Sequence, residues 1–356
     1  MSIFGRKYRI STFGESHCEA VGVIIDGVPP KMDIDIETIQ KQLTRRRPGQ
    51  SDITTPRDEK DKVEILSGIE HGKTLGTPIC AIVRNNNIRK EDYGFLDLNN
   101  YIPRPSHADL TYIMKYGTHA SSGGGRSSAR ETIGRVIGGT IGEIYLKKTY
   151  GIEIVAFVSQ IGDIKIKLDN ELFDRVSRDE VDRNKVRCPD AVNAGRMIAL
   201  VRKIQMAGDS IGGKITCICR NVPAGLGEPC FDKLEALLAH AMMSLPATKG
   251  FEVGSGFGCC TMKGSEHNDE FVMKTDGIGT KTNFSGGIQG GISNGEYIYF
   301  NVAFKPASSI SIPQNTVDLN GEPQKIEVKG RHDPCFVYRA VPIVEAMTAC
   351  VLMDVI

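Results

Sequence analysis

The sequence contains no tryptophan, and aromatic residues make up only 6% of it. Its 44 Lys and Arg residues balance 43 Asp and Glu residues, which gives a net charge of +1. A protein with so little net charge has little overall electrostatic attraction to nucleic acid or to an acidic membrane. No apolar run approaches the roughly 20 residues that a membrane-spanning helix needs, and residues 1–7 hold no apolar stretch of signal-peptide length. These absences predict a cytoplasmic enzyme or binding protein that engages neither nucleic acid nor membrane.

The motifs of several common sites are also missing. The ten cysteines include no C-x2-C pair of the kind found in structural zinc sites, so we expect no metal and mostly buried thiols. No G-x-G-x-x-G dinucleotide fingerprint follows a strand pattern, no Walker A loop is complete, and no H-E-x-x-H zinc motif or hydrolase elbow occurs. No low-complexity linker divides the chain, and we therefore expect a single domain over residues 1–356.

Glycine, by contrast, is abundant, with 39 residues that gather at turns and inside apolar segments. The pattern predicts a long helix over 127–148, with Gly134, Gly138 and Gly142 on one face. Because each interior glycine costs about 1 kcal/mol relative to alanine, we expect this stripe to pack closely against a neighbouring helix. A central helix of this kind, together with several strand patterns, favours an α+β fold over a doubly wound parallel sheet.

The two halves of the chain show a faint similarity in the order of their predicted elements. Each half begins with an apolar strand that ends in a Gly/Pro turn. A helical pattern, a further strand and a long helix of small residues then follow in that order. These segments are 21–30, 35–47, 76–84 and 127–148 in the first half, and 215–225, 231–244, 295–305 and 340–355 in the second. The pattern predicts an internal repeat, although such units are common enough for a chance match.

Two polar segments in the first half have side chains suited to protons or anions. His17 lies in a glycine-bearing turn between two strand patterns, where an imidazole can transfer protons near neutral pH. A surface-loop histidine would look the same. Arg45–Gly49 places three arginines at a helix end, which suits a phosphate clamp but also the helix macrodipole. A nucleic-acid patch is a further alternative, weakened by the neutral net charge and the lack of interleaved aromatics.

Two further regions add glycines, serines and cations. Arg104–Asp109 is followed by Gly123–Glu131, whose triple glycine and helix-opening serines suit a phosphate or flavin-phosphate cradle as well as a simple helix cap. Later, Lys305–Ser309 and Gly330–Cys335 bring a lysine, an arginine, a histidine and an aspartate ahead of the last helix. The joint pattern is of arginines and serines for anions, with histidines and an aspartate for protons.

Three of these segments together resemble the signature sequences of the chorismate synthase family. They are Gly14–His17 running into Asp26–Pro29, Gly125–Thr132, and Arg331–Cys335 through Glu345–Met347. The likeness extends over essentially the whole chain and also covers Arg45–Gly49, Pro105–Asp109, Asp209–Gly213, Val222–Pro229 and Lys305–Ser309. The resemblance implies a β-α-β sandwich with helices inside and antiparallel sheets outside, assembled as a homotetramer.

The resemblance also implies an activity. Members of the family convert 5-enolpyruvylshikimate 3-phosphate to chorismate and phosphate by anti-1,4-elimination, the last step of the shikimate pathway, and require reduced FMN without net redox change. The substrate carries a phosphate and two carboxylates, and FMN carries another phosphate. An arginine-rich pocket on an otherwise neutral protein suits both molecules.

The roles of individual residues are likewise implied by the family. His17 resembles the histidine that protonates the departing phosphate, and His107 the one that protonates reduced flavin. Asp333 resembles the aspartate that helps to remove a proton from flavin N5. Substrate contacts map to Ser16, Arg46 and Arg130, with Arg331 also suited to substrate anions. Flavin contacts map to Arg126, Ser127, Ser128, Ala247, Gly290, Lys305, Pro306, Ala307, Ser308, Ser309 and Arg331.

Two positions depart from the family pattern. Asp52 stands where many relatives have an arginine, and its carboxylate would repel the 2′-phosphate of NADPH unless a cation intervened. Pro246 stands where an asparagine is common, beside the expected flavin contact Ala247. We therefore expect reduced flavin to come from an external source. A flavin- or NADPH-dependent oxidoreductase and an RNA-binding protein that uses Arg45–Arg47 stay open as alternatives.

Overall fold

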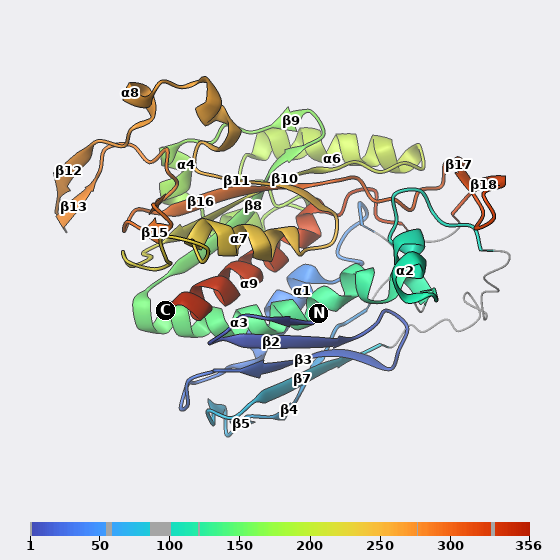
Figure 1. The fold of residues 1–356 in the computed structure, drawn as a ribbon, viewed down its shortest axis with the longest axis horizontal. Helices are drawn as coiled ribbons and strands as arrows, with labels where there is room; N and C mark the ends of the chain where they lie inside the picture. Colours follow the sequence, from blue (N-terminus) through green and yellow to red (C-terminus); the bar gives the residue numbers. More distant parts are fainter. Residues whose placement is uncertain (1, 55–58, 86–100, 120–121, 276, 329–331) are drawn as a thin grey trace.

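Two five-stranded antiparallel sheets frame the molecule (Figure 1). This computed structural model describes residues 2–54, 59–85, 101–119, 122–275, 277–328 and 332–356. The first sheet has the strand order β1-β2-β3-β7-β4 and the second β11-β16-β10-β8-β9. All neighbouring strands within them run antiparallel. The predicted α+β class is confirmed.

The strands of the two sheets are mostly six to nine residues long where they contact the helices. The first sheet contains β1 (Ile3–Phe4), β2 (Arg9–Gly14), β3 (Ala20–Asp26), β4 (Val63–Ser67) and β7 (Ile79–Arg84). The second contains β8 (Glu153–Ile161), β9 (Ile164–Lys165), β10 (Gly213–Arg220), β11 (Thr248–Val253) and β16 (Ile298–Phe304). Four small hairpins are β5 (Ile69–Glu70) with β6 (Lys73–Thr74), β12 (Phe271–Lys274) with β13 (Gly277–Thr280), β14 (Ile288–Gln289) with β15 (Ile292–Ser293), and β17 (Gln314–Val317) with β18 (Pro323–Ile326).

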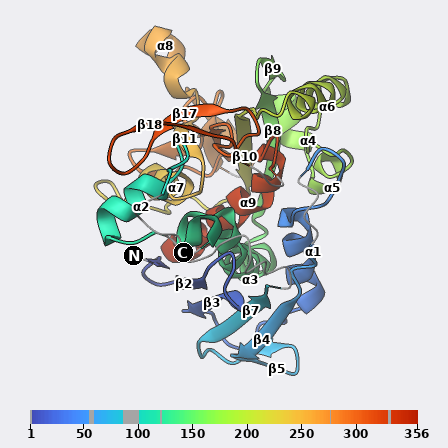
Figure 2. The same cartoon turned by 90° about the vertical axis from the view of Figure 1, so that its right-hand side faces the viewer.

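Helices lie between the two sheets, as both views show (Figures 1 and 2). These inner helices are α1 (Ile36–Arg46), α3 (Thr132–Tyr150), α7 (Leu234–Met243) and α9 (Val337–Val355). The remaining helices are α2 (Asp109–Tyr116), α4 (Asn170–Arg175), α5 (Arg178–Val181), α6 (Ala191–Met206) and α8 (Gly264–His267), with 3-10 turns η3 (Ser122–Ser127), η4 (Ala129–Glu131) and η5 (Gly256–Thr261). None of the helices in the described part of the chain is long and apolar enough to cross a membrane.

The long helix predicted from residue 127 begins later than expected, at Thr132. The preceding residues form the 3-10 turns η3 and η4 instead. Gly124 and Gly125 have φ angles of +100° and +52°, which an α-helix does not tolerate. The side chain of Ser128 then caps η4 by accepting a hydrogen bond from the backbone N–H of Arg130 at 3.2 Å. The glycine-rich segment therefore forms a turn with its own caps ahead of the helix.

The glycine stripe of α3 faces mainly a sheet, so the prediction that it packs against a helix is wrong for two of its three residues. A Cβ added to Gly134 would lie 2.8 Å from the carbonyl oxygen of Gly22 in β3. One added to Gly138 would lie 2.8 Å from the side chain of Ile10 in β2. Only Gly142 meets the neighbouring helix α9, at Met353. Glycine lets the helix axis approach the sheet closely on this face.

The close contact between helices is made instead through Gly139, on an adjacent face of α3. A Cβ added there would lie only 2.2 Å from the carbonyl oxygen of Ala346 in α9. The two long helices therefore touch backbone to backbone. Almost every residue of α9 is buried, because α3 lies on one side of it and β8 and β10 lie on the other.

The same strand order recurs in the two sheets. In the first, β2, β3, β7 and β4 lie side by side, and in the second β8, β10, β16 and β11 occupy the corresponding places in chain order. In each half one inner helix, α1 or α7, precedes the last two strands, and another, α3 or α9, follows them. This correspondence supports the internal repeat, whose origin by duplication stays a prediction.

The cysteines are less buried than expected. All ten lie within the described residues and are free thiols, and five of them are buried. The prediction is wrong for Cys230, Cys259 and Cys260, which are exposed. Their segments, by α7 and in η5, lie outside the helix-filled space between the sheets.

Candidate functional site

A cavity of about 440 Å³ opens where segments of both halves meet, a volume typical of small-molecule sites. It lies beside the turns that lead into α3, the start of β11, the end of β16 and the residues just before α9. Its lining combines Arg104, Ser106, His107, Ala108, Ser127, Ser128 and Ala129 with Pro246, Ala247, Lys305, Pro306, Ala307, Ser308, Ser309, His332, Asp333 and Phe336. Most of the residues to which the sequence assigned flavin contacts therefore share one wall.

His107 is held in a defined orientation inside this cavity. Its Nδ1 lies 2.6 Å from a carboxylate oxygen of Asp109, and Arg104 donates to the same carboxylate at 2.7 and 2.8 Å. The Cε1–Nε2 edge of the imidazole lies against Gly124, where an added Cβ would come within 3.0 Å of Cε1 and 3.5 Å of Nε2. With Nδ1 engaged by the carboxylate, Nε2 is the atom placed to exchange a proton.

The carboxylate of Asp109 stays ionised over a wide pH range. Burial alone would raise its pKa, but hydrogen bonds from Arg104 and His107 outweigh that effect and hold the pKa well below its usual range. Arg104 also donates to the hydroxyl of Ser309 at 3.0 Å. One guanidinium therefore connects the histidine of the first half to the serine segment of the second.

Lys305 supplies a positive charge to the cavity wall. Its ammonium donates to the hydroxyl of Ser308 at 2.6 Å and to the carbonyl of Ser106 at 3.3 Å, and no carboxylate among the described residues pairs with it. Burial, with Lys249 nearby, lowers its pKa. Ser210 supports the segment from behind by donating to the carbonyl of Ala307 at 2.7 Å. An unpaired ammonium beside hydroxyl groups suits an anionic ligand group.

Two non-glycine residues of the lining have left-handed backbone conformations. Ser106 has a φ of +60° and Ala247 a φ of +68°. Such residues are uncommon and tend to gather at functional sites, where the surrounding structure holds them. Hydrogen bonds from Lys305 and Ser308 to the carbonyl of Ser106, and from the amide of Lys305 to the carbonyl of Ala247, hold these two turns.

Asp333 reaches the cavity from the segment just before α9. Its carboxylate pairs with the guanidinium of Arg339, which lies one turn into that helix, is buried and also contacts the ring of Phe336. Neighbouring His332 has a pKa lowered by burial and by the charge of Arg104. The neutral imidazole of His332 is therefore favoured beside the Asp333–Arg339 ion pair.

A second cavity of about 540 Å³ adjoins the first and shares Ser127 and Pro246 with it. Arg126 lines this second cavity, not the first. Its guanidinium donates to the carbonyls of Thr12 and Gly14 at 3.1 and 2.9 Å, which ties η3 to the end of β2. Arg126 therefore connects the serine turn to the strand that leads into the His17 loop.

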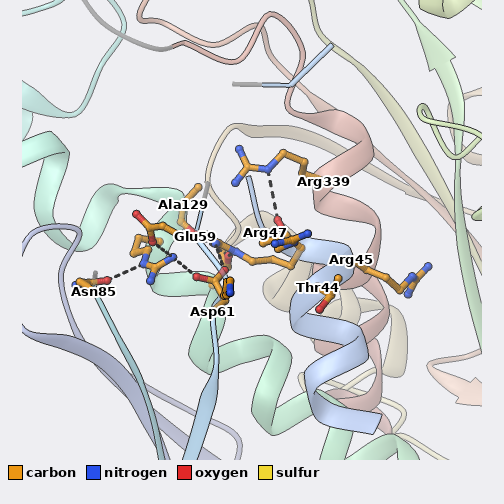
Figure 3. Close-up of polar contacts among 12 residues, drawn as sticks. Thr44, Arg45, Arg47, Glu59, Asp61, Asn85, Ala129 and Arg339 are labelled. Carbon is orange, nitrogen blue, oxygen red and sulfur yellow. Dashed lines mark hydrogen bonds and ion pairs between the residues drawn. The ribbon is translucent and has the colours of Figure 1, made fainter. Parts of the chain in front are cut away.

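The two arginines assigned to substrate lie in a buried polar network outside both cavities. Arg46 donates to the hydroxyl of Thr132 at 3.1 Å and pairs with Asp61, and burial lowers its pKa to about 9 against the opposing effect of Asp61. Arg130 pairs with Glu59 and Asp61, each at 2.5 Å. Figure 3 shows Glu59 and Asp61 converging beside Ala129, while Arg45 points away from them.

Arg45 therefore does not act with Arg46 as one clamp. It pairs with buried Glu345 of α9 and with Asp182, whereas Arg46 contacts Asp61 and Thr132. The prediction of a joint three-arginine clamp is wrong for Arg45, because successive helix positions point in different directions. Its charge stabilises the packing of α1 against α9.

Ser16 and His17 lie in the loop between β2 and β3, outside the lining of both cavities. The Ser16 hydroxyl is buried, and no protein group in the described part of the chain hydrogen-bonds to it. Gly290 lies in the turn between β14 and β15 and lines neither cavity; the next residue, Gly291, accepts a hydrogen bond from the amide of Leu234 at the start of α7. Arg331 lies outside the described residues, so its predicted role stays a prediction.

The two departures from the family pattern have different surroundings. Asp52 pairs with Lys185 at 2.5 Å and Arg202 at 2.8 Å, and these partners lower its pKa to about 2. Cations do intervene there, so its carboxylate gives no reason to exclude a phosphate. Pro246 lies on the wall between the two cavities, where it contributes apolar surface.

Sequence reasoning missed several residues of this region. The spacing of His107 and Asp109 was a usable signal, since a carboxylate two residues from a histidine can hold its ring. Glu59, Asp61 and Asn85 carried no signal, because they come from separate segments and meet only in the folded chain. Arg339 is missed although it lies within the third signature segment, because nothing in the sequence indicated that it pairs with Asp333 six residues earlier.

The fold and the cavity define an α+β protein whose cavity combines a lysine and serine hydroxyls with an oriented histidine and an aspartate. A family model described as "Chorismate synthase" matches residues 8–356. The chain is 57% identical over 363 residues to the chorismate synthase of Saccharomyces cerevisiae, covering 99% of this chain and 96% of that protein. It is 56% identical over 355 residues to the chorismate synthase of Prochlorococcus marinus, with the same coverage.

A solved crystal structure of a chorismate synthase superimposes with a TM-score of 0.77 at 29% sequence identity, and the match covers 99% of this chain and 92% of that one. The chain belongs to the chorismate synthase family.

Proposed function

We propose that the protein converts 5-enolpyruvylshikimate 3-phosphate to chorismate and phosphate by anti-1,4-elimination, as the last step of the shikimate pathway, with reduced FMN in the 440 Å³ cavity. The observation that carries the proposal is the meeting of an oriented histidine, an aspartate and a lysine in one cavity of a chorismate synthase fold. No carboxylate among the described residues pairs with this lysine. The family supplies the chorismate-forming chemistry.

The residues present fit a flavin mononucleotide. Lys305 and the serines around it offer a cation and hydroxyl donors for a phosphate, and Ala247, Pro246 and Phe336 offer apolar surface for a ring system. Bound there, reduced flavin would supply the electron density and the hydrogen acceptor that the elimination needs. The backbone turn at Ala247 and the serines of η3 would set how deeply such a ring enters.

The acid–base roles follow from the side chains. His107 would deliver a proton from Nε2 toward the flavin, since Asp109 holds Nδ1. Asp333, whose carboxylate pairs with Arg339, would accept a proton. His17 would protonate the departing phosphate, and the buried hydroxyl of Ser16 directly precedes it in the loop. Arg130 is connected to this loop through hydrogen bonds of Asn85, and Arg46 shares the carboxylate of Asp61 with Arg130. General acid catalysis of this kind contributes typically about 100- to 10,000-fold.

One assay tests the proposal directly. Purified protein is incubated without oxygen with dithionite-reduced FMN and 5-enolpyruvylshikimate 3-phosphate, and phosphate and chorismate are measured in parallel. We expect equal amounts of both products and no net oxidation of FMN. Phosphate released without chorismate would show a different reaction.

The protein is further proposed to act as a cytoplasmic homotetramer that receives reduced flavin from an external source. The absence of a dinucleotide fingerprint in the sequence supports the external source. Light scattering of the purified protein tests the assembly, since a monodisperse monomer would exclude it.

A further inference from the structure

Asn85 follows the last residue of β7 and makes contacts that neither the signature sequences nor the cavity lining include. Its side-chain amide nitrogen donates to the carbonyl of Glu15 at 3.0 Å and to the carbonyl of Cys18 at 2.6 Å. These two carbonyls bracket Ser16 and His17. A single amide group therefore spans the loop at residues 15–18, which we name the His17 loop.

The other end of the same amide is held by Arg130. The Nε of Arg130 donates to the side-chain oxygen of Asn85 at 2.8 Å, and the contact is drawn in Figure 3 beside the label of Asn85. Asn85 is only 6% exposed and Arg130 only 4%, so water competes little for these hydrogen bonds. The backbone amide of Asn85 also donates to the carbonyl of Glu19 at 2.9 Å.

The orientation of the amide follows from its partners. An arginine can only donate and a carbonyl can only accept, so the oxygen must face Arg130 and the nitrogen must face the His17 loop. Only an amide offers an acceptor at one atom and two donor hydrogens at the other. An aspartate of the same shape would keep the pair with Arg130 and lose both contacts with the loop.

We propose that Asn85 is a positioning residue, which fixes the His17 loop relative to Arg130 and so sets the direction in which His17 delivers its proton. This inference rests on the proposed function. Arg130 lies in η4, and Ser128, which caps that turn, lines the cavity, so the amide connects the loop of the proposed proton donor to the wall of the proposed ligand site. Asn85 acts through His17 and touches no reacting atom.

The test is a double-mutant cycle in the anaerobic assay. We expect Asn85→Asp to lower kcat by about 10-fold, the scale of a misplaced proton donor, and to change KM by less than about twofold. In a His17→Ala background the same substitution should change kcat by less than about twofold, because there is no imidazole left to position. In a His107→Ala background the full 10-fold loss should persist.

A matched control separates this role from loop packing in general. Asn184 spans a loop in a similar way, donating to the carbonyl of Cys188 at 2.6 Å and accepting from its amide at 3.2 Å, but lies away from both cavities. Asn184→Asp should leave kcat unchanged. If Asn85→Asp does not fold, as judged by circular dichroism, Asn85→Ala replaces it in the same cycle, since it removes the contacts without adding a charge.

A readout without turnover keeps the inference separable from the proposed function. Labelling by diethyl pyrocarbonate, followed by mass spectrometry, should modify His17 at least about threefold faster in Asn85→Asp while the rate at His107 stays unchanged. Equal effects of Asn85→Asp in both histidine backgrounds, or an unchanged labelling rate of His17, would overturn the inference. If the wild type makes no chorismate but His17 labelling responds, the proposed function fails and the positioning stands.

Discussion

Arg104 shows how a single residue joins the two halves of the chain at the cavity. Its guanidinium pairs with Asp109, lies 3.1 Å from Nδ1 of His107 and donates to Ser309, which lies 205 residues further along the chain. A lysine would not reproduce this fork of donors. The geometry of the proposed proton donor therefore depends on a contact with the segment proposed to bind flavin.

Loss of either proposed proton donor should reduce turnover without unfolding the protein. We expect His107→Ala and His17→Ala each to lower kcat by about 10-fold or more. His267→Ala is the control, because His267 lies in α8 and outside the lining of both cavities. Circular dichroism checks the fold. Near-normal turnover of either variant would remove that histidine from the mechanism.

The pairing of Asp109 predicts a pH dependence of stability. Because its folded-state pKa is held below the usual range, Asp109 stabilises the native state above the unfolded-state pKa of roughly 4, and this contribution fades as pH falls toward the folded-state value. At pH 7 we expect Asp109→Asn to cost about 1–3 kcal/mol. In thermal melts, the difference in Tm between the wild type and Asp109→Asn should be constant between pH 8 and 5 and should become smaller below roughly pH 4. A difference that widens in acid would contradict this.

At the residue scale, sequence predicted best where a side chain lies within a continuous motif. His107, Ser127, Ser128 and Lys305 meet in one cavity. Partners brought from distant segments could not be predicted, because only the tertiary fold brings Asn85 to the His17 loop. Nor did the pattern show that Arg46 and Arg130 are paired with carboxylates, since Glu59 and Asp61 lie in no recognisable motif.

Among the elements, α3 and α9 depend on the absence of a side chain where they cross. Gly139→Ala would place a methyl group 2.2 Å from the backbone of Ala346, so the helices would have to separate. We expect a loss of about 1–3 kcal/mol in the free energy of unfolding, measured by urea denaturation. Gly195→Ala in α6 is the matched control, because nothing lies within 4 Å of an added Cβ there. It should stabilise the protein by about 0.5–1 kcal/mol. An unchanged Gly139→Ala variant would show that the helices can separate at little cost.

Elements with strong periodicity were predicted well, and their neighbours were not. The helix expected over 35–47 is α1, and the strand expected over 215–220 lies within β10. The glycine stripe of α3 was assigned the wrong neighbour, since a glycine face signals close approach without saying whether a strand or a helix approaches. Helix periodicity also could not show that 3-10 turns precede Thr132.

For the molecule as a whole, the proposed external source of flavin has a clear outcome. Because no dinucleotide fingerprint occurs in the sequence, we expect oxidised FMN and NADPH alone to support little chorismate formation. Stopped-flow absorbance of oxidised FMN, after anaerobic mixing of protein with NADPH, measures this. Bleaching at a rate comparable to chorismate formation would establish a nicotinamide site in the chain.

The burial of α9 between α3 and the second sheet sets a timing problem during synthesis. Residue 150 ends α3 and residue 337 begins α9, so 186 residues separate the two partners along the chain. At about 5–20 residues per second, a ribosome needs roughly 10–40 s to travel from one to the other. Throughout that interval the face of α3 that α9 covers in the folded protein lacks its partner helix. The nascent chain therefore exposes apolar surface for a long period, during which chaperones have time to bind and aggregation competes with folding.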